Sequence, residues 1–289
     1  MSHSLVQRVL PSLAVLGSVV SLCLGTSFAK HLFPIVGAQG TTALRVGFSA
    51  VLLLLIWRPW RFGPSRANLK QIACFGVALG LMNLLFYMAI KRLPFGVTVA
   101  IEFVGPLSVA VWTSRRWLDF VWLGLAVLGL FLLLILPLFG TNFGLLDPLG
   151  IALALAAAAC WATYIVLGKR AGQMHGGMVV SLGLLSAALV VVPFGVAEAG
   201  AKLLLPEMLL YGVAVAAVSS AVPYSLEMFA LKRLSPGAFS TMLATEPAVA
   251  AIAGMLVLGE HLTLVQWMAI AVIMAAAMGS ALTAQPQQK

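Results

Sequence analysis

Long apolar stretches alternate with short polar connections along the whole chain. A transmembrane helix needs roughly 20 mostly apolar residues to cross about 30 Å of hydrocarbon, and ten stretches reach that length. They lie near residues 11–29, 38–57, 71–90, 95–114, 118–137, 148–168, 178–197, 208–230, 237–258 and 264–283. The pattern therefore predicts an all-α integral membrane protein with ten transmembrane helices.

The composition supports this prediction. Of the 289 residues, 62% are hydrophobic and only 9% are charged, whereas a soluble domain is about one quarter charged. The formal charge of +9 does not indicate nucleic-acid binding, because the basic residues lie in short connections between apolar stretches. The three cysteines, Cys23, Cys74 and Cys160, lie inside apolar stretches without metal-ligand spacing.

The basic residues also predict an orientation. Of the 17 lysines and arginines, twelve fall on the side that holds both termini, four fall on the other side, and Arg45 lies within a stretch. Cytoplasmic connections of membrane proteins carry the excess of basic residues. We therefore expect a multi-pass membrane protein with both termini in the cytoplasm.

The two halves of the chain resemble each other. Six residues recur 141 positions later: Ala89, Lys91, Arg92, Leu93, Gly96 and Pro106 match Ala230, Lys232, Arg233, Leu234, Gly237 and Pro247. This predicts two five-helix repeats, residues 1–140 and 141–289, and an odd number of helices inverts the second repeat. Inverted repeats around a central cavity are typical of alternating-access transporters, although simple duplication of a membrane scaffold would leave the same pattern.

Four ionisable residues fall inside the predicted helices: Arg45, Glu102, Glu227 and Glu246. Such residues cost roughly 2.5 to 3.5 kcal/mol on insertion scales and usually mark function. Arg45 and Glu102 each lie about seven residues, or roughly 10 Å, from the outer end of their helices, so an ion pair between them is possible. Glu246 is expected near the membrane midplane.

Other residues of the predicted helices are candidates for lining a cavity. Asn83 and Tyr87 lie four residues apart in one helix, and Ser220, Tyr224 and Glu227 share one face of another. Trp161 and Tyr164 lie one turn apart. Packing between helices explains these side chains as well as substrate contact does.

Two prolines occupy equivalent positions in the repeats. Pro106 and Pro247 each lie inside a predicted helix, where proline frees a backbone carbonyl and permits a kink. Kinked helices at these positions would line a central cavity, but proline can also serve only to shape a helix.

The sequence contains no recognisable catalytic or phosphate-binding motif, and its four histidines lie outside the predicted helices. We therefore expect neither an enzyme nor a protein with a cofactor or bound metal. A lipid-modifying enzyme would need clustered polar groups near the interface. Because no ATP-binding motif is present, the energy for transport must come from a gradient or from the substrate. A channel or a receptor is a further alternative, and it would differ from a transporter by lacking saturable, gradient-dependent flux.

Several segments carry a resemblance to a known family. The stretches AIEFVGPLSVAVWTSRRWLDFVW (100–122), CWATYIVLGKRAG (160–172), PYSLEMFALKRL (223–234) and TEPAVAAIAGMLVLGE (245–260) resemble the drug/metabolite transporter superfamily, specifically its ten-helix members with two EamA domains. The resemblance implies proton-driven export of small hydrophilic amino acids such as threonine and homoserine from the cytoplasm, by a protein of the bacterial inner membrane. Export of drugs or other metabolites such as purines is the alternative on this scaffold.

The resemblance also bears on the candidate residues. The family pattern Gly-Glu appears as Gly259-Glu260, while the first half has Ser114-Arg115-Arg116 in the corresponding region, which makes Glu260 a weaker candidate for a symmetric role.

A zwitterionic substrate needs a cation for its carboxylate and a carboxylate for its ammonium. Our hypothesis is that Arg45 binds the former and that Glu102 or Glu246 exchanges a proton for substrate. A purely structural Arg45–Glu102 ion pair is the alternative, and the pattern does not predict an oligomeric state.

Overall fold

The computed structural model describes residues 2–61, 65–114, 117–134, 146–171, 174, 176–231, 239 and 242–283. Within these ranges the regular structure is helical. Five helices are long and apolar enough to cross a membrane, and five shorter apolar helical segments accompany them. The predicted ten-helix, all-α membrane fold is confirmed.

Seven helical elements of the first half are described. They are α1 (Ser2–Lys30), α2 (Phe33–Trp57), the short η1 (Pro59–Arg61), α3 (Arg66–Ile90), α4 (Phe95–Glu102), α5 (Val104–Ser114) and α6 (Trp117–Leu134). Their apolar residues give each one a surface that suits lipid or a neighbouring helix rather than water.

The second half follows the same plan. Its described elements are α7 (Pro148–Ala171), α8 (Gly176–Ala199), η3 (Gly200–Leu204), α9 (Pro206–Ala216), the π-helical η4 (Ala217–Ala221), α10 (Val222–Leu231), α12 (Glu246–Leu258) and α13 (Leu264–Thr283). The repeat elements Lys232, Arg233, Leu234 and Gly237 lie outside the described residues.

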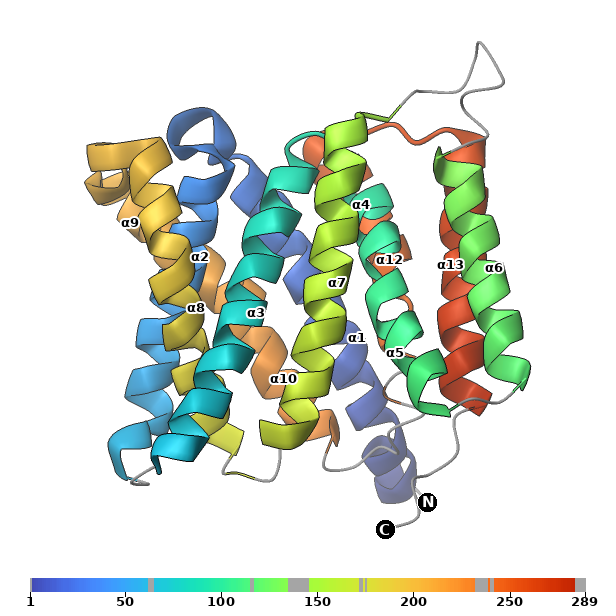
Figure 1. Ribbon diagram of the computed structural model, residues 1–289, viewed down its shortest axis with the longest axis horizontal. Helices are drawn as coiled ribbons and strands as arrows, with labels where there is room; N and C mark the ends of the chain where they lie inside the picture. Colours follow the sequence, from blue (N-terminus) through green and yellow to red (C-terminus); the bar gives the residue numbers. More distant parts are fainter. Residues whose placement is uncertain are drawn as a thin grey trace.

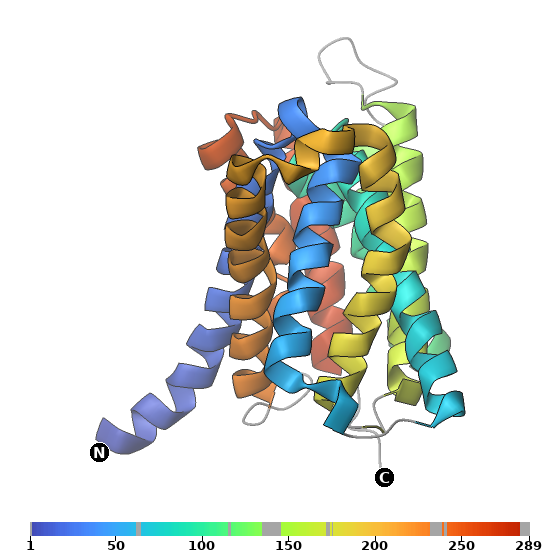
Figure 2. The ribbon, with the colours of Figure 1, turned by 90° about the vertical axis from the view of Figure 1, so that its left-hand side faces the viewer.

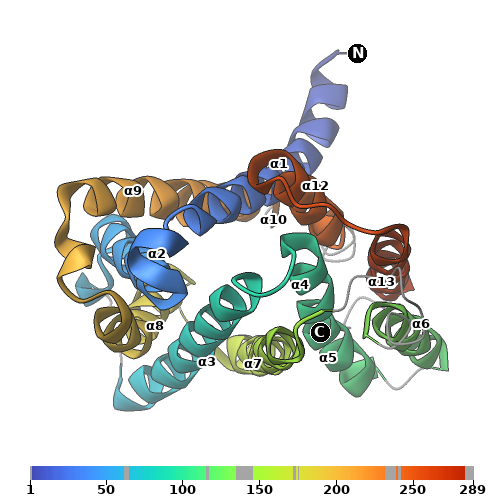
Figure 3. The ribbon, with the colours of Figure 1, turned by 90° about the horizontal axis from the view of Figure 1, so that it is seen from above.

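The helices stand side by side and run between two faces of the molecule (Figures 1 and 2). We call the face where α1 begins and α13 ends the terminal face, and the other the opposite face. Seen from above, α4 and α12 lie side by side near the centre, and α6 and α13 pair at one end (Figure 3). In addition α2 packs on α8, α3 on α7, and α1 on α10. The pairs α2–α8, α4–α12 and α6–α13 join corresponding helices of the two predicted repeats, and the repeat relates the pair α3–α7 to the pair α10–α1. This arrangement supports the division at residues 140 and 141, which stays a prediction.

Where they fall on described residues, the predicted helix boundaries agree with the structure to within a few residues, except at the start of the first three helices. The predicted end at residue 137 and the predicted start at residue 237 lie outside the described residues. α2 has one extra turn, residues 33–36, ahead of the predicted start at residue 38, and Gly37, with φ of 73°, separates this turn from the rest of the helix. Positive φ is readily available to glycine. Arg45 lies eight residues beyond Gly37, roughly 12 Å along the axis of the continuous part of α2, which is close to the predicted depth.

A break interrupts the helix in each half that carries the paired prolines. α4 ends at Glu102, Phe103 forms a turn, and α5 begins at Val104. In the second half a turn at Ala244 and Thr245 precedes α12. Pro106 and Pro247 therefore lie in the first turn of the helical segment that follows each break, where a missing N–H costs no intrahelical hydrogen bond.

Candidate functional site

A cavity of about 270 Å³ lies between the two halves. Residues of α1, α2, α3, α4, α7, α10 and α12 contribute to its wall, together with Leu243. Its lining residues are Leu22, Thr26, Arg45, Leu79, Met82, Asn83, Phe86, Phe95, Glu102, Trp161, Tyr164, Glu227, Leu243 and Glu246. The structure thus brings together six of the eight predicted cavity residues.

Arg45 is held in place by three hydrogen bonds. Its Nε donates to Ser219 Oγ at 3.0 Å, its Nη1 to Asn83 Oδ1 at 3.1 Å, and its Nη2 to the Ser219 carbonyl at 3.4 Å. Its guanidinium also lies over the Tyr87 ring, 5.4 Å from the centroid, a geometry that attracts cations. A guanidinium has five N–H donors, so two of them are available to a ligand.

Arg45 and Glu102 line the same cavity but do not form an ion pair among the described residues. The break after Glu102 and the register of α2 direct the guanidinium toward Ser219 and Asn83 instead. The possible ion pair between Arg45 and Glu102 is therefore not what the structure shows.

Two carboxylates lie at helix ends within the cavity wall. Glu102 is the last residue of α4 and is 7% exposed, and Glu246 is the first residue of α12. Within the described part of the chain neither side chain has a hydrogen-bond or ion-pair partner. The first turn of a helix favours a negative charge and the last turn disfavours it, so the two carboxylates have different electrostatic surroundings.

Aromatic side chains form one side of the cavity. Trp161 packs edge-on against Phe103 with ring centroids 5.2 Å apart, and Tyr164 lies 4.6 Å from Phe75. Tyr87 differs from the prediction, because it is fully buried beneath Arg45 and does not line the cavity. It acts on the site through the orientation of Arg45.

The predicted stripe of Ser220, Tyr224 and Glu227, which extends over η4 and α10, has mixed roles. Ser220 accepts a hydrogen bond from Ser49 Oγ at 2.9 Å, a contact between helices. Glu227 lines the cavity and accepts a hydrogen bond from Ser18 Oγ at 3.0 Å. The side chain of Tyr224 lies outside the described residues.

Sequence reasoning missed Ser219 and Thr26 as parts of the site. Ser219 lies in the π-helical segment Ala217–Ala221, and π-helical turns are frequent at functional sites. The wider turn gives both its hydroxyl and its carbonyl to Arg45. Adjacent serines in an apolar helix were the only signal in the sequence.

Comparison with known proteins decides the family. The model of the EamA-like transporter family matches residues 148–282. The threonine/homoserine exporter RhtA of Escherichia coli strain K12 is 48% identical over 97% of this chain and 94% of its own length. This chain belongs to the EamA-like transporter family. Another member, RhtA of Salmonella typhimurium strain LT2, is also 48% identical, over 97% of this chain and 95% of its own.

A solved structure supports the fold of this EamA-like transporter. A protein of known crystal structure, 17% identical in sequence, superposes with a TM-score of 0.57 and covers 96% of this chain and 97% of its own. At that identity the likeness concerns the fold alone. The predicted family resemblance is confirmed, and the chain is a multi-pass membrane transporter.

Proposed function

We propose that this protein exports threonine, homoserine and similar small hydrophilic amino acids from the cytoplasm across the inner membrane, in exchange for protons. In this proposal the terminal face is cytoplasmic, as its excess of basic residues predicts, and admits the substrate. Relatives of nearly equal length that are 48% identical carry the name threonine/homoserine exporter. The observation that carries the proposal is one cavity with a fixed guanidinium and two unpaired carboxylates.

The geometry suits a zwitterion. The two free N–H donors of Arg45 bind the substrate carboxylate as a pair, and the carboxylates of Glu102 and Glu246 bind its ammonium. An amino acid thereby satisfies groups that would otherwise remain without partners in a poorly hydrated site, where such groups are costly.

Proton coupling follows from competition for the same carboxylate. A carboxylate in an apolar cavity needs a positive partner, and either a proton or the substrate ammonium supplies it. Glu102, at the unfavourable end of α4, is the residue we assign as proton carrier. At Glu102 the proton and the substrate ammonium replace each other, Glu246 at the other helix end contributes to ammonium binding, and Glu227 connects the cavity with the terminal face.

The size of the cavity favours an amino acid over a drug. Pockets for drug-sized ligands measure roughly 300 to 1,000 Å³, and this cavity measures about 270 Å³. Competition by purines or cationic drugs for the export of labelled threonine would favour the broader exporter, whereas the cavity predicts no competition.

The test uses inside-out membrane vesicles that contain the protein. Uptake of labelled threonine and homoserine is followed with and without an imposed proton gradient. Saturable uptake that collapses with the gradient is expected, and its absence beside correctly inserted protein would refute the proposal.

The carboxylate roles are tested in the same vesicles. Glu102→Gln should abolish gradient-driven uptake but retain exchange of labelled for unlabelled threonine, whereas Glu246→Gln should abolish both. Glu207→Gln is the matched control, because Glu207 is exposed and lies outside the cavity. Unchanged gradient-driven transport in both cavity variants would exclude this mechanism.

A further inference from the structure

Three ion pairs lie on the opposite face, and they are all the ion pairs found among the described residues. Lys30 Nζ lies 2.5 Å from Glu260 Oε1, Lys91 Nζ lies 3.5 Å from Glu198 Oε1, and Arg92 Nη1 lies 2.7 Å from Asp147 Oδ2. In every pair the cation belongs to residues 1–140 and the acid to residues 141–289. Each pair therefore joins the two predicted repeats.

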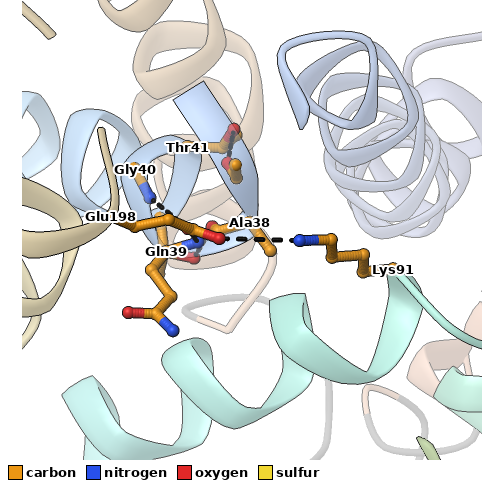
Figure 4. A network of polar contacts seen from close by, with 8 residues as sticks. Ala38, Gln39, Gly40, Thr41, Lys91 and Glu198 are labelled. Atoms are coloured by element: carbon orange, nitrogen blue, oxygen red, sulfur yellow. Dashed lines mark hydrogen bonds and ion pairs between the residues drawn. The ribbon is translucent and has the colours of Figure 1, made fainter. Parts of the chain in front are cut away.

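Each acid also accepts a hydrogen bond from a backbone amide near the start of a helix. Glu198 accepts from Gln39 N at 2.6 Å and from Gly40 N at 3.3 Å, just after the Gly37 break of α2. Figure 4 shows the Glu198 carboxylate between these amides and Lys91. One carboxylate thus holds α2, α8 and the end of α3 together.

The other two acids act in the same way. Glu260 accepts from Phe95 N at 2.7 Å, at the first residue of α4, and Asp147 accepts from Leu149 N at 2.8 Å, at the start of α7. The guanidinium of Arg92 and the backbone amide hold the pKa of Asp147 below its usual range, so this acid remains charged at neutral pH.

An aromatic layer separates this charged layer from the cavity. Phe86 and Phe95 line the cavity on the side of the opposite face, with ring centroids 6.3 Å apart. Tyr87 packs against both Phe86 and Phe33, each at 6.0 Å. Between the cavity and the opposite face the structure therefore has a layer of aromatic packing and a layer of ion pairs.

The sequence does not provide an equivalent set of acids for the terminal face. Residues 1–140 contain only two acidic residues, Glu102 in the cavity wall and Asp119. The counterparts of Lys91 and Arg92 in the second half are Lys232 and Arg233, among the twelve basic residues of that side. Residues 1–140 therefore lack counterparts of Glu198, Glu260 and Asp147 that could pair with the basic residues of the terminal face.

We propose that Glu198, Glu260 and Asp147 form an ionic lock on the opposite face, and that its absence on the terminal face makes the state open to the cytoplasm the resting state. This inference rests on the proposed function. The lock favours one of the two conformations of a symmetric scaffold. In an exporter the favoured conformation must leave the binding site accessible to substrate from the cytoplasm. The three pairs must separate before the substrate leaves at the opposite face.

The experiment measures access to the cavity instead of transport. Met82 lines the cavity and makes no polar contact with any other described residue, so Met82→Cys serves as a reporter in a protein whose native cysteines are replaced by alanine. A membrane-impermeant maleimide is applied to intact cells, which exposes the opposite face, and to inside-out vesicles, which exposes the terminal face.

The lock is removed with Glu198→Gln, Glu260→Gln and Asp147→Asn, because an amide oxygen still accepts the backbone hydrogen bond while the charge is lost. The triple variant should label about tenfold faster than the reporter alone in intact cells, and more slowly in vesicles. Glu207→Gln, which removes an unpaired acid near the same face, should label at the rate of the reporter alone.

The outcomes separate the two proposals. Equal labelling of the triple variant and the reporter in intact cells would overturn the lock, whatever the transport assay shows. A labelling shift in a protein that moves no amino acid would keep the lock and refute the proposed function. If the triple variant fails to insert, Glu198→Gln and Glu260→Gln are measured singly, and no shift in either overturns the proposal.

Discussion

At the scale of single residues, the site depends on how Arg45 is held. Three of its N–H groups are already bound by Ser219 and Asn83, and its planar face rests on Tyr87. These contacts fix the direction of the remaining two donors. A flexible cation at the same depth would keep the charge but lose this orientation.

Arg45→Lys should therefore lower the rate of threonine transport by about 10- to 100-fold, because it removes charge-assisted hydrogen bonds, each of which contributes roughly 1.5 to 3 kcal/mol. The amount of protein in the membrane should not change. Ser49→Ala, which removes a hydrogen bond to Ser220 outside the cavity, is the control and should transport at nearly the normal rate. Normal transport by Arg45→Lys would show that charge alone suffices.

The buried charges of this site could be predicted from the sequence because the membrane makes them expensive. Arg45, Glu102 and Glu246 are visible as ionisable residues in apolar stretches. Ser219 is not, because serine is common in transmembrane helices and nothing in the sequence announces the π-helical turn. Helical spacing predicts that Tyr87 points toward the cavity, but it does not predict that the Arg45 side chain covers the Tyr87 ring.

At the scale of helices, the two halves approach each other closely where α4 crosses α12. A Cβ atom on Gly96 would overlap with the backbone of Ala251, so only glycine permits this spacing. The same small-residue logic governs helix association in membranes generally. The two helices that carry Glu102 and Glu246 can thus pack closely because Gly96 has no side chain.

Gly96→Val should destabilise the protein by about 1 to 3 kcal/mol, because an overpacked contact forces the helices apart. The measurement is the thermal unfolding midpoint of the purified protein in detergent. Gly124→Ala in α6 is the matched control, since a Cβ at Gly124 meets nothing within 4 Å, and it should leave the midpoint unchanged or raise it. Equal midpoints for Gly96→Val and the wild type would contradict the close packing.

The number and order of helices followed from the lengths of the apolar stretches, because membrane thickness imposes one scale on all of them. Local breaks did not follow. Gly37 appears as one glycine among 27, and only the structure shows its positive φ and the carboxylate of Glu198 that binds the released amides. The paired prolines indicated the region of the other breaks but not the residue at which each helix ends.

At the scale of the whole molecule, the basic residues on the opposite face are partly explained by the lock. Lys30, Lys91 and Arg92 depart from the excess of basic residues on the cytoplasmic side. Each one has an acid partner from the other half. In the folded protein these three cations thus take part in the proposed ionic lock on the opposite face, whereas the orientation of the protein in the membrane depends on the twelve basic residues of the terminal face.

Orientation should therefore survive removal of the lock. Acidic residues contribute little to topology, which follows lysine and arginine, so the triple variant Glu198→Gln, Glu260→Gln and Asp147→Asn should insert as the wild type does. A C-terminal fusion to green fluorescent protein should fluoresce in both, and a fusion to alkaline phosphatase should be inactive in both, because both reporters would lie in the cytoplasm. An active phosphatase fusion to the wild-type protein would reverse the assignment of the two faces. Activity only in the triple variant would show that the acids guide insertion as well as closure.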